Sequence, residues 1–260
     1  MASCNYTQIR PISSEGSYGI IRLVECNKTK KKFVMKFNKN KDVGLNELEI
    51  MRQLGSYPMI IKLHEVILTD YKITIILEYI EGCNLKQYGV ITDIYLTREI
   101  FKQLGQAIEY CHEKGVIHSD IKPDNVMIDN DNNIKLIDFG LSYVYDPNVK
   151  KTSKGTPLYY APEEFDGGHV NFKKDIYAYG VTIYECLVGH CPYDYDENPD
   201  SLTFEEYRRR VLNDPLDYTK LKIPTYAKRL IARLLSKTPS VRPTMKETLG
   251  HIFFTSKDIL

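Results

Sequence analysis

The stretch "VIHSDIKPDNVMI", residues 116–128, places polar residues at fixed offsets between two apolar runs. Asp120 and Asn125 are five residues apart, and Asp138 follows in "KLIDFG". A short loop that holds an Asp and an Asn, together with an Asp at a strand end, can gather oxygen ligands around a magnesium ion. Magnesium prefers oxygen ligands and usually shares them with substrate phosphates. These three residues therefore predict a site for magnesium and a phosphate.

A glycine-rich turn lies upstream of this stretch. The sequence "SEGSYG", residues 14–19, is followed by the apolar run "IIRLV" and is typical of a turn between strands. Gly16 and Gly19 would let backbone amides approach phosphates closely. Each piece alone is weak, because most glycine-rich turns are only turns and an Asp-x4-Asn pattern is common. The order and spacing of the pieces are much more specific.

Apolar periodicity and turn residues divide the chain into a strand-rich first third and a helical remainder. The expected strands are residues 20–26, 31–37 and 72–80, with a polar hairpin turn at 27–30. The expected helices are residues 45–54, 96–115, 173–189 and 225–236. Thr97 is expected to cap the start of the second helix, and Gly115 its end. The break between the two lobes is expected near residues 79–83.

Composition argues against several classes of protein. The net charge of +1 gives no sign of nucleic-acid or membrane binding. There is no run of eighteen apolar residues and no secretory signal at the N-terminus. The six cysteines form no CxxC pair, which favours reduced thiols inside a cell, in the cytoplasm, the nucleus or both. Cys186, His190 and Cys191 lie close together, but a second ligand cluster is missing, so core or surface roles are favoured over a metal site.

Nine segments in order resemble the catalytic domain of eukaryotic-type protein kinases. They extend from about residue 6 to about residue 255 and are "SEGSYGII", "FVMK", "NELEIM", "LEYIEG", "YCHEKGVIHSDIKPDN", "LIDFG", "GTPLYYAPE", "KDIYAYGVTIYECLVGHCPYD" and "RPTMKETLGHIFF". The resemblance implies an α+β bilobal fold, with a small antiparallel β-sheet lobe that carries one helix and a larger, mainly helical lobe. It also implies a single domain over residues 1–260, with a first lobe at about 1–79, a hinge at about 78–83 and a second lobe at about 83–260.

The same resemblance assigns roles to the polar residues. Asp120 would accept or orient the proton of a substrate hydroxyl, and Asn125 and Asp138 would hold Mg²⁺ or Mn²⁺. Lys122 would steady the γ-phosphate, and Thr156 would contact Asp120 and Lys122. Lys36 would pair with the α- and β-phosphates of ATP, held by Glu47, with Glu49 as the fallback. The lysine two residues after Asp120, together with "GTPLYYAPE", resembles the Ser/Thr subgroup.

The resemblance also implies an adenine pocket with Ile21, Val34 and Leu77 above the base and Met127 below it. The complete set of residues implied to bind ATP is Ser14, Glu15, Gly16, Ser17, Tyr18, Gly19, Ile21, Val34, Lys36, Leu77, Glu78, Ile80, Met127 and Asp138. Backbone groups at Glu78 and Ile80 would bond the base. Structural roles are expected for a second set of residues. His118, Phe139, Met51 and Leu63 would stack in the core, Asp175 would brace the catalytic loop, and Glu163 and Arg242 would form a buried ion pair.

The sequence departs from the family at four positions. Ser14 stands where the first loop glycine is expected, and Val34 stands where a small alanine is usual. Ser119 replaces the arginine of the His-Arg-Asp motif, which usually meets a phosphate on the activation loop. Lys36 and Glu47 are only eleven residues apart, which is shorter than usual by about one to two helical turns.

Two of these departures suggest how the enzyme is controlled. Ser119 and the short spacing predict activity without phosphorylation of the activation loop, although Thr152 and Ser153 lie in that loop. The short helix also suggests that a protein contact, such as a homodimer, holds Glu47 inward.

Acidic residues near the predicted site bear on the class of substrate. Asp124, Glu185 and the acidic run at 194–200 suggest a basic peptide or protein substrate.

A small-molecule phosphotransferase of the aminoglycoside or choline kinase type is one alternative function, although "GTPLYYAPE" and Lys122 favour a protein kinase. A pseudokinase scaffold is another, although no catalytic residue is lost. The residue usage favours A/T-rich codons and suggests a large DNA virus of the baculovirus kind or an A/T-rich parasite.

Overall fold

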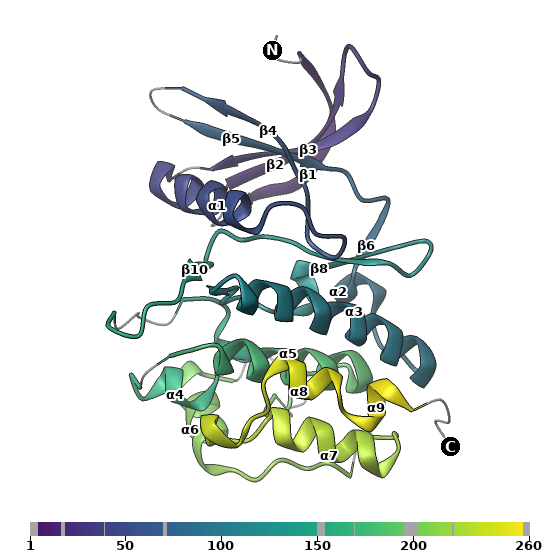
Figure 1. The fold of residues 1–260 in the computed structure, drawn as a ribbon, viewed down its shortest axis with the longest axis vertical. Helices are drawn as coiled ribbons and strands as arrows, with labels where there is room; N and C mark the ends of the chain where they lie inside the picture. Colours follow the sequence, from purple (N-terminus) through teal and green to yellow (C-terminus); the bar gives the residue numbers. More distant parts are fainter. Residues whose placement is uncertain are drawn as a thin grey trace.

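A computed structural model of the protein describes residues 5–16, 19–38, 40–69, 72–149, 154–168, 170–194, 202–219 and 221–256. Figure 1 shows a twisted β-sheet with one helix, α1, at one end of the molecule and a group of helices at the other. Short strands, among them β8 and β10, lie between these two parts. The expected α+β fold, with an antiparallel sheet lobe followed by a helical lobe, is confirmed.

The sheet has five antiparallel strands in the order β1-β2-β3-β5-β4. They are β1 (Tyr6–Gly16), β2 (Gly19–Cys26), β3 (Lys32–Asn38), β4 (Leu63–Leu68) and β5 (Ile73–Glu78). In this register Ile21 lies opposite Lys36, and Val34 lies opposite both Leu23 and Leu77. Because side chains alternate between the faces of a strand, these residues share one face. The opposite face carries a separate small apolar cluster around Val24, Phe33 and Ile76.

Helix α1 (Lys41–Leu54) begins four residues before the expected start at 45. Asn40 explains the earlier start, because its side chain accepts hydrogen bonds from the amides of Asp42 and Val43. The buried residues of α1 include Leu48, Met51 and Leu54. They belong to the same apolar core as β5 and the helical lobe, so α1 links the two parts of the molecule.

The helical part is built around α5 (Lys173–Val188), in which Lys174 to Cys186 are all buried. Around it lie α2 (Leu85–Tyr88), α3 (Ile94–Glu113), α4 (Pro162–Phe165), α6 (Phe204–Asn213), α7 (Thr225–Leu234), α8 (Met245–Leu249) and α9 (Ile252–Thr255). Short 3₁₀ turns complete it: η1 (Pro123–Asn125), η2 (Pro157–Tyr159) and η4 (Pro239–Val241).

The expected cap at Thr97 is wrong. Asp93 caps α3 by accepting from the amides of Tyr95 and Leu96, so the helix begins at Ile94. Thr97 lies inside the helix, where its hydroxyl donates to the Asp93 carbonyl at 2.8 Å. At the other end Lys114 is the cap residue, and Gly115 follows it with a φ of +74°.

Two small sheets position the loops that carry the predicted site. One pairs β6 (Gly82–Asn84), β8 (Val126–Asp129) and β9 (Ile134–Leu136), and the other pairs β7 (Val116–Ile117) with β10 (Tyr143–Val144). The loop with Asp120 therefore runs between β7 and β8, and Asp138 follows β9. The single-domain assignment and the hinge at 78–83 stay predictions, although β5 ends at Glu78.

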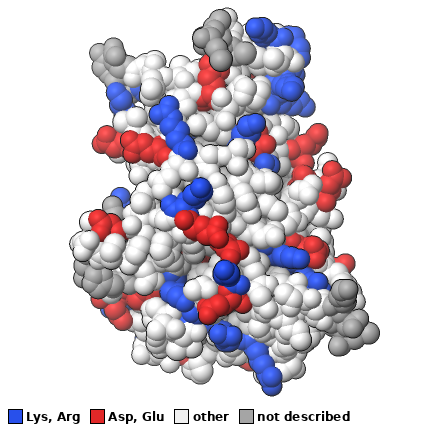
Figure 2. Space-filling view, in the orientation of Figure 1, with Lys and Arg blue, Asp and Glu red and all other residues white. Residues whose placement is uncertain are grey.

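Lys, Arg, Asp and Glu side chains are interspersed on the face shown in Figure 2, without a large area of one sign. This agrees with the net charge of +1. Within the described ranges, no helix is long and apolar enough to cross a bilayer.

Candidate active site

The carboxylate of Asp120 is the centre of the loop between β7 and β8. Its Oδ1 accepts from the Thr156 amide at 3.1 Å and from the Thr156 hydroxyl at 3.0 Å. Its Oδ2 lies 2.8 Å from the Lys122 ammonium and accepts from the Asn125 amide at 2.9 Å. Lys122 also donates to the Thr156 hydroxyl at 2.6 Å. The expected contacts of Thr156 with Asp120 and Lys122 are therefore confirmed.

Asp175, near the start of α5, braces this loop as expected. Its carboxylate accepts from the amides of His118 and Ser119 at 2.8 and 2.9 Å, and its Oδ2 lies 3.0 Å from His112 Nε2. Burial alone would raise the pKa of Asp175, but these contacts outweigh burial and hold the pKa below its usual value. The backbone just before Asp120 is thus fixed by a buried anion.

Lys36 on β3 joins two carboxylates that are distant in sequence. Its Nζ lies 2.8 Å from Glu47 Oε1 and 2.7 Å from Asp138 Oδ1. Burial would lower the pKa of Lys36, but the two carboxylates outweigh it and raise the pKa to about 12. The same cation lowers the pKa of Asp138 against the effect of burial. Glu49 is exposed, so Glu47 and not the fallback residue is the partner of Lys36.

Contacts within the chain hold Glu47 inward. Asn38 donates to Glu47 Oε2 at 3.4 Å, and Asn46 donates to the Ser142 carbonyl at 2.8 Å. At the end of α1, Tyr110 donates to the Leu54 carbonyl at 2.5 Å. The helix is therefore fastened to β3, to the segment after Asp138 and to α3.

Asp138 has a left-handed backbone, with a φ of +63°, which is uncommon for a residue other than glycine. Its Oδ1 accepts from the Gly140 amide at 3.2 Å in addition to Lys36. Phe139 is fully buried against His118, with ring centroids 4.9 Å apart. Met51 belongs to the same core, and Leu63 packs against it half-buried, as expected for this set.

The residues available for magnesium fit that ion. Asn125 uses its amide nitrogen for two bonds to Asp120, which leaves its oxygen available as a ligand. Asp138 supplies a carboxylate, and both are the hard oxygen donors that magnesium prefers. In the part of the chain that the structure describes, no group of three or more His, Cys, Asp or Glu side chains could hold a metal ion. A magnesium ion at this site would complete its coordination with water molecules and with phosphate oxygens of a bound substrate.

The face of the sheet above these residues suits a nucleotide base. Ile21, Val34 and Leu77 lie on the face that carries Lys36, and Met127 lies on β8 beneath it. Glu78 Oε1 accepts from the Lys62 amide and the Lys135 ammonium, both at 2.7 Å. Ile80 is half-buried just beyond β5.

The glycine-rich turn is described only in part. Ser17 and Tyr18 lie outside the described residues, and so do the side chains of Ser14 and Glu15, while Gly16 pairs with Gly19 across β1 and β2. Gly19 has a φ of +115°, and a Cβ there would lie 1.9 Å from the Phe37 carbonyl oxygen, so only glycine fits.

The residues expected to meet a substrate differ in their surroundings. Asp124 is exposed on η1 beside the catalytic loop. Glu185 is buried, where Lys86 lies 2.6 Å from its Oε1 and the Tyr159 hydroxyl donates to its Oε2 at 2.5 Å. Glu185 and Lys86 line a pocket of about 150 Å³ with Pro123, and Asp124 is not part of its lining. Residues 195–200 of the acidic run lie outside the described residues.

The expected ion pair between Glu163 and Arg242 is confirmed. Two guanidinium nitrogens of Arg242 each lie 2.7 Å from one carboxylate oxygen of Glu163. Arg242 is 1% exposed and also donates to the Ser236 carbonyl at 2.7 Å. The pair ties the segment after Thr156 to the C-terminal part of the helical lobe.

Three contacts near the predicted site residues were missed from the sequence. Lys174 and Glu164 form a buried ion pair beside Ser119, and Lys86 neutralises Glu185. The only sequence signal was a lysine directly before Asp175 and a glutamate directly after Glu163, which by themselves are typical of solvated surface charges.

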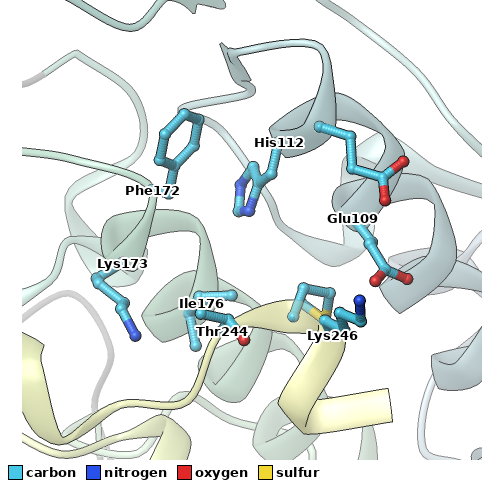
Figure 3. Close-up of a pocket in the computed structure, with 9 residues that line it drawn as sticks. Glu109, His112, Phe172, Lys173, Ile176, Thr244 and Lys246 are labelled. Atoms are coloured by element: carbon cyan, nitrogen blue, oxygen red, sulfur yellow. The ribbon is translucent and has the colours of Figure 1, made fainter. Parts of the chain in front are cut away.

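A larger cavity of about 250 Å³ lies away from the predicted catalytic residues, between α3, the start of α5 and α8. Figure 3 shows His112 and Phe172 on one side of it and Thr244 and Lys246 on the other. It shares no residue with the predicted catalytic or nucleotide-binding sets, and His112 in its wall bonds Asp175, the residue that braces the catalytic loop.

The chain belongs to the protein kinase domain family, which it matches over residues 6–254. It is 34% identical over 254 residues to the SNF1-related protein kinase catalytic subunit alpha KIN12 of Arabidopsis thaliana, covering 93% of this chain and 50% of the relative. It is 33% identical over 252 residues to the CBL-interacting serine/threonine-protein kinase 8 of the same plant, covering 90% and 54%. It is 34% identical over 252 residues to the serine/threonine protein kinase OSK3 of Oryza sativa, covering 92% and 48%.

The chain thus spans about half the length of these relatives. They are plant proteins, so they give no support to a viral origin, which stays a prediction.

Proposed function

We propose that this protein is a serine/threonine protein kinase that transfers the γ-phosphoryl group of ATP, with Mg²⁺ or Mn²⁺, to a hydroxyl of a protein substrate. The observation that carries the proposal is the closed set of contacts among Asp120, Lys122 and Thr156. It joins a carboxylate and a cation to the segment that follows the activation loop. The relatives' names, which describe protein kinases, support the same activity.

The chemistry follows from these positions. Phosphoryl transfer depends mainly on positioning and on stabilising charge. Asp120 accepts or orients the proton of the substrate hydroxyl, and Lys122 places positive charge beside it. Asn125 fixes the orientation of the Asp120 carboxylate by donating to Oδ2. Lys36 meets the α- and β-phosphates, and a bound magnesium ion would supply further neutralising charge at Asn125 and Asp138.

The direct test compares wild type with Asp120→Asn on a panel of basic and acidic proteins. The variant is expected to lose phosphate transfer by about a hundredfold or more, because general base catalysis contributes about 10²–10⁴-fold. It should keep the thermal shift produced by ATP and Mg²⁺. Asp131→Asn, which removes an exposed carboxylate in the β8–β9 turn, is the matched control and should retain full activity.

Two outcomes of that test favour other functions. Transfer to aminoglycosides or choline, with none to protein, would identify a small-molecule phosphotransferase. A thermal shift with ATP but no transfer by wild type to any acceptor would identify a pseudokinase scaffold. Equal rates in wild type and Asp120→Asn would reject the role of the carboxylate.

We also propose that activity does not require phosphorylation of the activation loop. Ser119, in place of an arginine, supports this because its hydroxyl already bonds the Lys154 carbonyl at 3.2 Å. Thr152 and Ser153 lie outside the described residues. Phosphatase-treated protein and the double variant Thr152→Ala, Ser153→Ala should keep most of their activity, and loss in either sample would refute the proposal.

A preference for basic substrates rests mainly on Asp124. Its carboxylate is exposed next to the catalytic loop, whereas Glu185 is already neutralised by Lys86. A peptide array should favour Lys and Arg near the acceptor hydroxyl, and Asp124→Asn should weaken that preference. An array that favours acidic sequences would contradict the proposal.

The remaining proposals concern partners and location. A homodimer, or another protein bound against α1, would add to the internal contacts that hold Glu47. Full activity of a monomer in light scattering would exclude that need.

An intracellular location, in the cytoplasm, the nucleus or both, is supported by five described cysteines that are all free thiols. Localisation of the tagged protein in its own cells would test this.

A further inference from the structure

Ser119 holds an unusual conformation directly before Asp120. Its φ is +75°, in the left-handed region that residues other than glycine rarely adopt. Asp175 fixes the backbone by accepting from the Ser119 amide at 2.9 Å. The hydroxyl donates to the Lys154 carbonyl at 3.2 Å, so it links the catalytic loop to the segment that leads to Thr156.

The same hydroxyl receives a hydrogen bond from a buried cation. Lys174 is 3% exposed, and its ammonium lies 2.8 Å from Ser119 Oγ and 2.7 Å from Glu164 Oε1. Glu164 Oε2 in turn accepts from the Ala161 amide at 2.9 Å. A buried ion pair seldom gains enough attraction to repay its lost hydration unless further hydrogen bonds support it. Here those bonds come from α4 and from the catalytic loop.

The segment held at Lys154 reaches the catalytic carboxylate within two residues. Gly155 follows with a φ of +134°, and a Cβ there would lie 2.7 Å from the Ser119 carbonyl oxygen. Thr156 then bonds Asp120 through both its amide and its hydroxyl. An unbroken series of contacts therefore runs from Glu164 through Lys174 and Ser119 to the residues beside Asp120.

We propose that Lys174, neutralised by Glu164, is a positioning residue that holds the Lys154–Thr156 segment on the catalytic loop through the Ser119 hydroxyl. The inference rests on the proposed kinase function and supplies a physical reason for activity without loop phosphorylation. Lys174 supplies the cation and Glu164 the anion, so the Lys154–Thr156 segment is held on the catalytic loop without a phosphate group. Lys174 acts through Ser119 and touches none of the reacting atoms.

The series of contacts also explains why a serine suits position 119. An arginine there would bring a second cation against the buried Lys174 ammonium, with Glu164 as the carboxylate that the two would share. Uncompensated charge is costly in a buried site. Ser119→Arg, which restores the usual family residue, should therefore reduce activity in this protein.

The first experiment removes the hydroxyl and leaves the ion pair intact. Ser119→Ala should lower kcat about tenfold, the size expected for losing one hydrogen bond to a charged group, with KM for ATP within about twofold of wild type. Amide exchange across residues 154–160, read by mass spectrometry, should become faster. Thr182→Val is the matched control, because it removes a buried hydroxyl bond on α5 that does not reach the segment.

The second experiment moves the cation. Lys174→Met should lower kcat at least as much as Ser119→Ala, and Lys174→Arg should rescue most of the loss. Ser119→Arg combined with Lys174→Ala leaves a single cation to pair with Glu164, and it should recover kcat about tenfold over Ser119→Arg alone.

Several results would overturn the inference. One is that Ser119→Ala matches Thr182→Val in both kcat and exchange. Another is that Ser119→Arg exceeds wild type, or that the double variant is no better than Ser119→Arg alone. If wild type transfers no phosphate to any acceptor, the proposed function fails, but the exchange rates of Ser119→Ala still decide whether the hydroxyl positions the segment.

Discussion

Replacement of Arg242 by methionine tests how the segment after Thr156 is anchored to the helical lobe. The guanidinium pairs with both carboxylate oxygens of Glu163 at 2.7 Å and donates to the carbonyls of Ser236 at 2.7 Å and Lys173 at 3.0 Å. It also lies 4.9 Å from the centre of the Tyr177 ring. Methionine replaces the apolar stem of the side chain but leaves the Glu163 carboxylate and the carbonyls without this donor.

The size of the effect follows from burial. Arg242 is 1% exposed, and removal of one partner from a buried ion pair costs about 3–5 kcal/mol. Each kcal/mol lowers Tm by about 2–4 °C in a protein of this size class, so Arg242→Met should lower Tm by roughly 6–20 °C. Arg209→Met is the control, because that arginine is 50% exposed and solvent-exposed ion pairs add little to stability.

The assay combines calorimetry with kinetics at a temperature where every variant is folded. KM for ATP should stay within about twofold, since Arg242 anchors the segment after Thr156 and is not among the residues predicted to bind ATP, while KM for a protein substrate should rise. The double variant Glu163→Leu, Arg242→Met removes both charges and should recover part of the lost stability. A Tm within about 2 °C of wild type for Arg242→Met, or no recovery in the double variant, would refute the reasoning.

Three further predictions concern the loop and the nucleotide side. Gly155→Ala should lower kcat about tenfold, because its Cβ would lie 2.7 Å from the Ser119 carbonyl oxygen in the catalytic loop. Gly115→Ala is the control, because its Cβ would meet no atom within 4 Å and should cost only about 1 kcal/mol of stability. Equal effects of the two variants in kinetics and calorimetry would contradict this. Glu47→Gln should lower kcat/KM for ATP about tenfold by weakening the hold on Lys36, and an unchanged value would exclude that role. Contacts with His112 and with the loop amides hold the pKa of folded Asp175 below its unfolded value, although burial opposes this. The ionised Asp175 carboxylate therefore stabilises the fold fully above about pH 4, and this stabilisation is lost as pH falls through the lowered pKa. The difference in unfolding free energy between wild type and Asp175→Asn should shrink below about pH 4 in urea titrations, and a constant difference down to pH 2 would contradict the assignment.

The sequence predicted those parts of the fold that depend on neighbouring residues. Apolar periodicity located α5 and α7, and the hairpin of β2 and β3 was evident from its polar turn. The choice of Glu47 over Glu49 also came from local pattern, because Ile50 and Met51 had to face the core of the same helix. The error at Thr97 has a local cause too. Asp93 lies four residues earlier and offers the same capping chemistry.

The sequence by itself determined the types, order and spacing of the polar residues, and these sufficed to nominate Asp120, Asn125 and Asp138. Only the tertiary structure decided which charges are buried and which partners they meet. Lys174 reaches Ser119 across 55 positions, and Lys86 reaches Glu185 across 99. The free energy of such a pair depends on how fully packing excludes water around it, and that exclusion is set by α5 and the elements around it. Local sequence pattern does not contain this information, so a lysine that looks like a surface charge became part of the buried support of the catalytic loop.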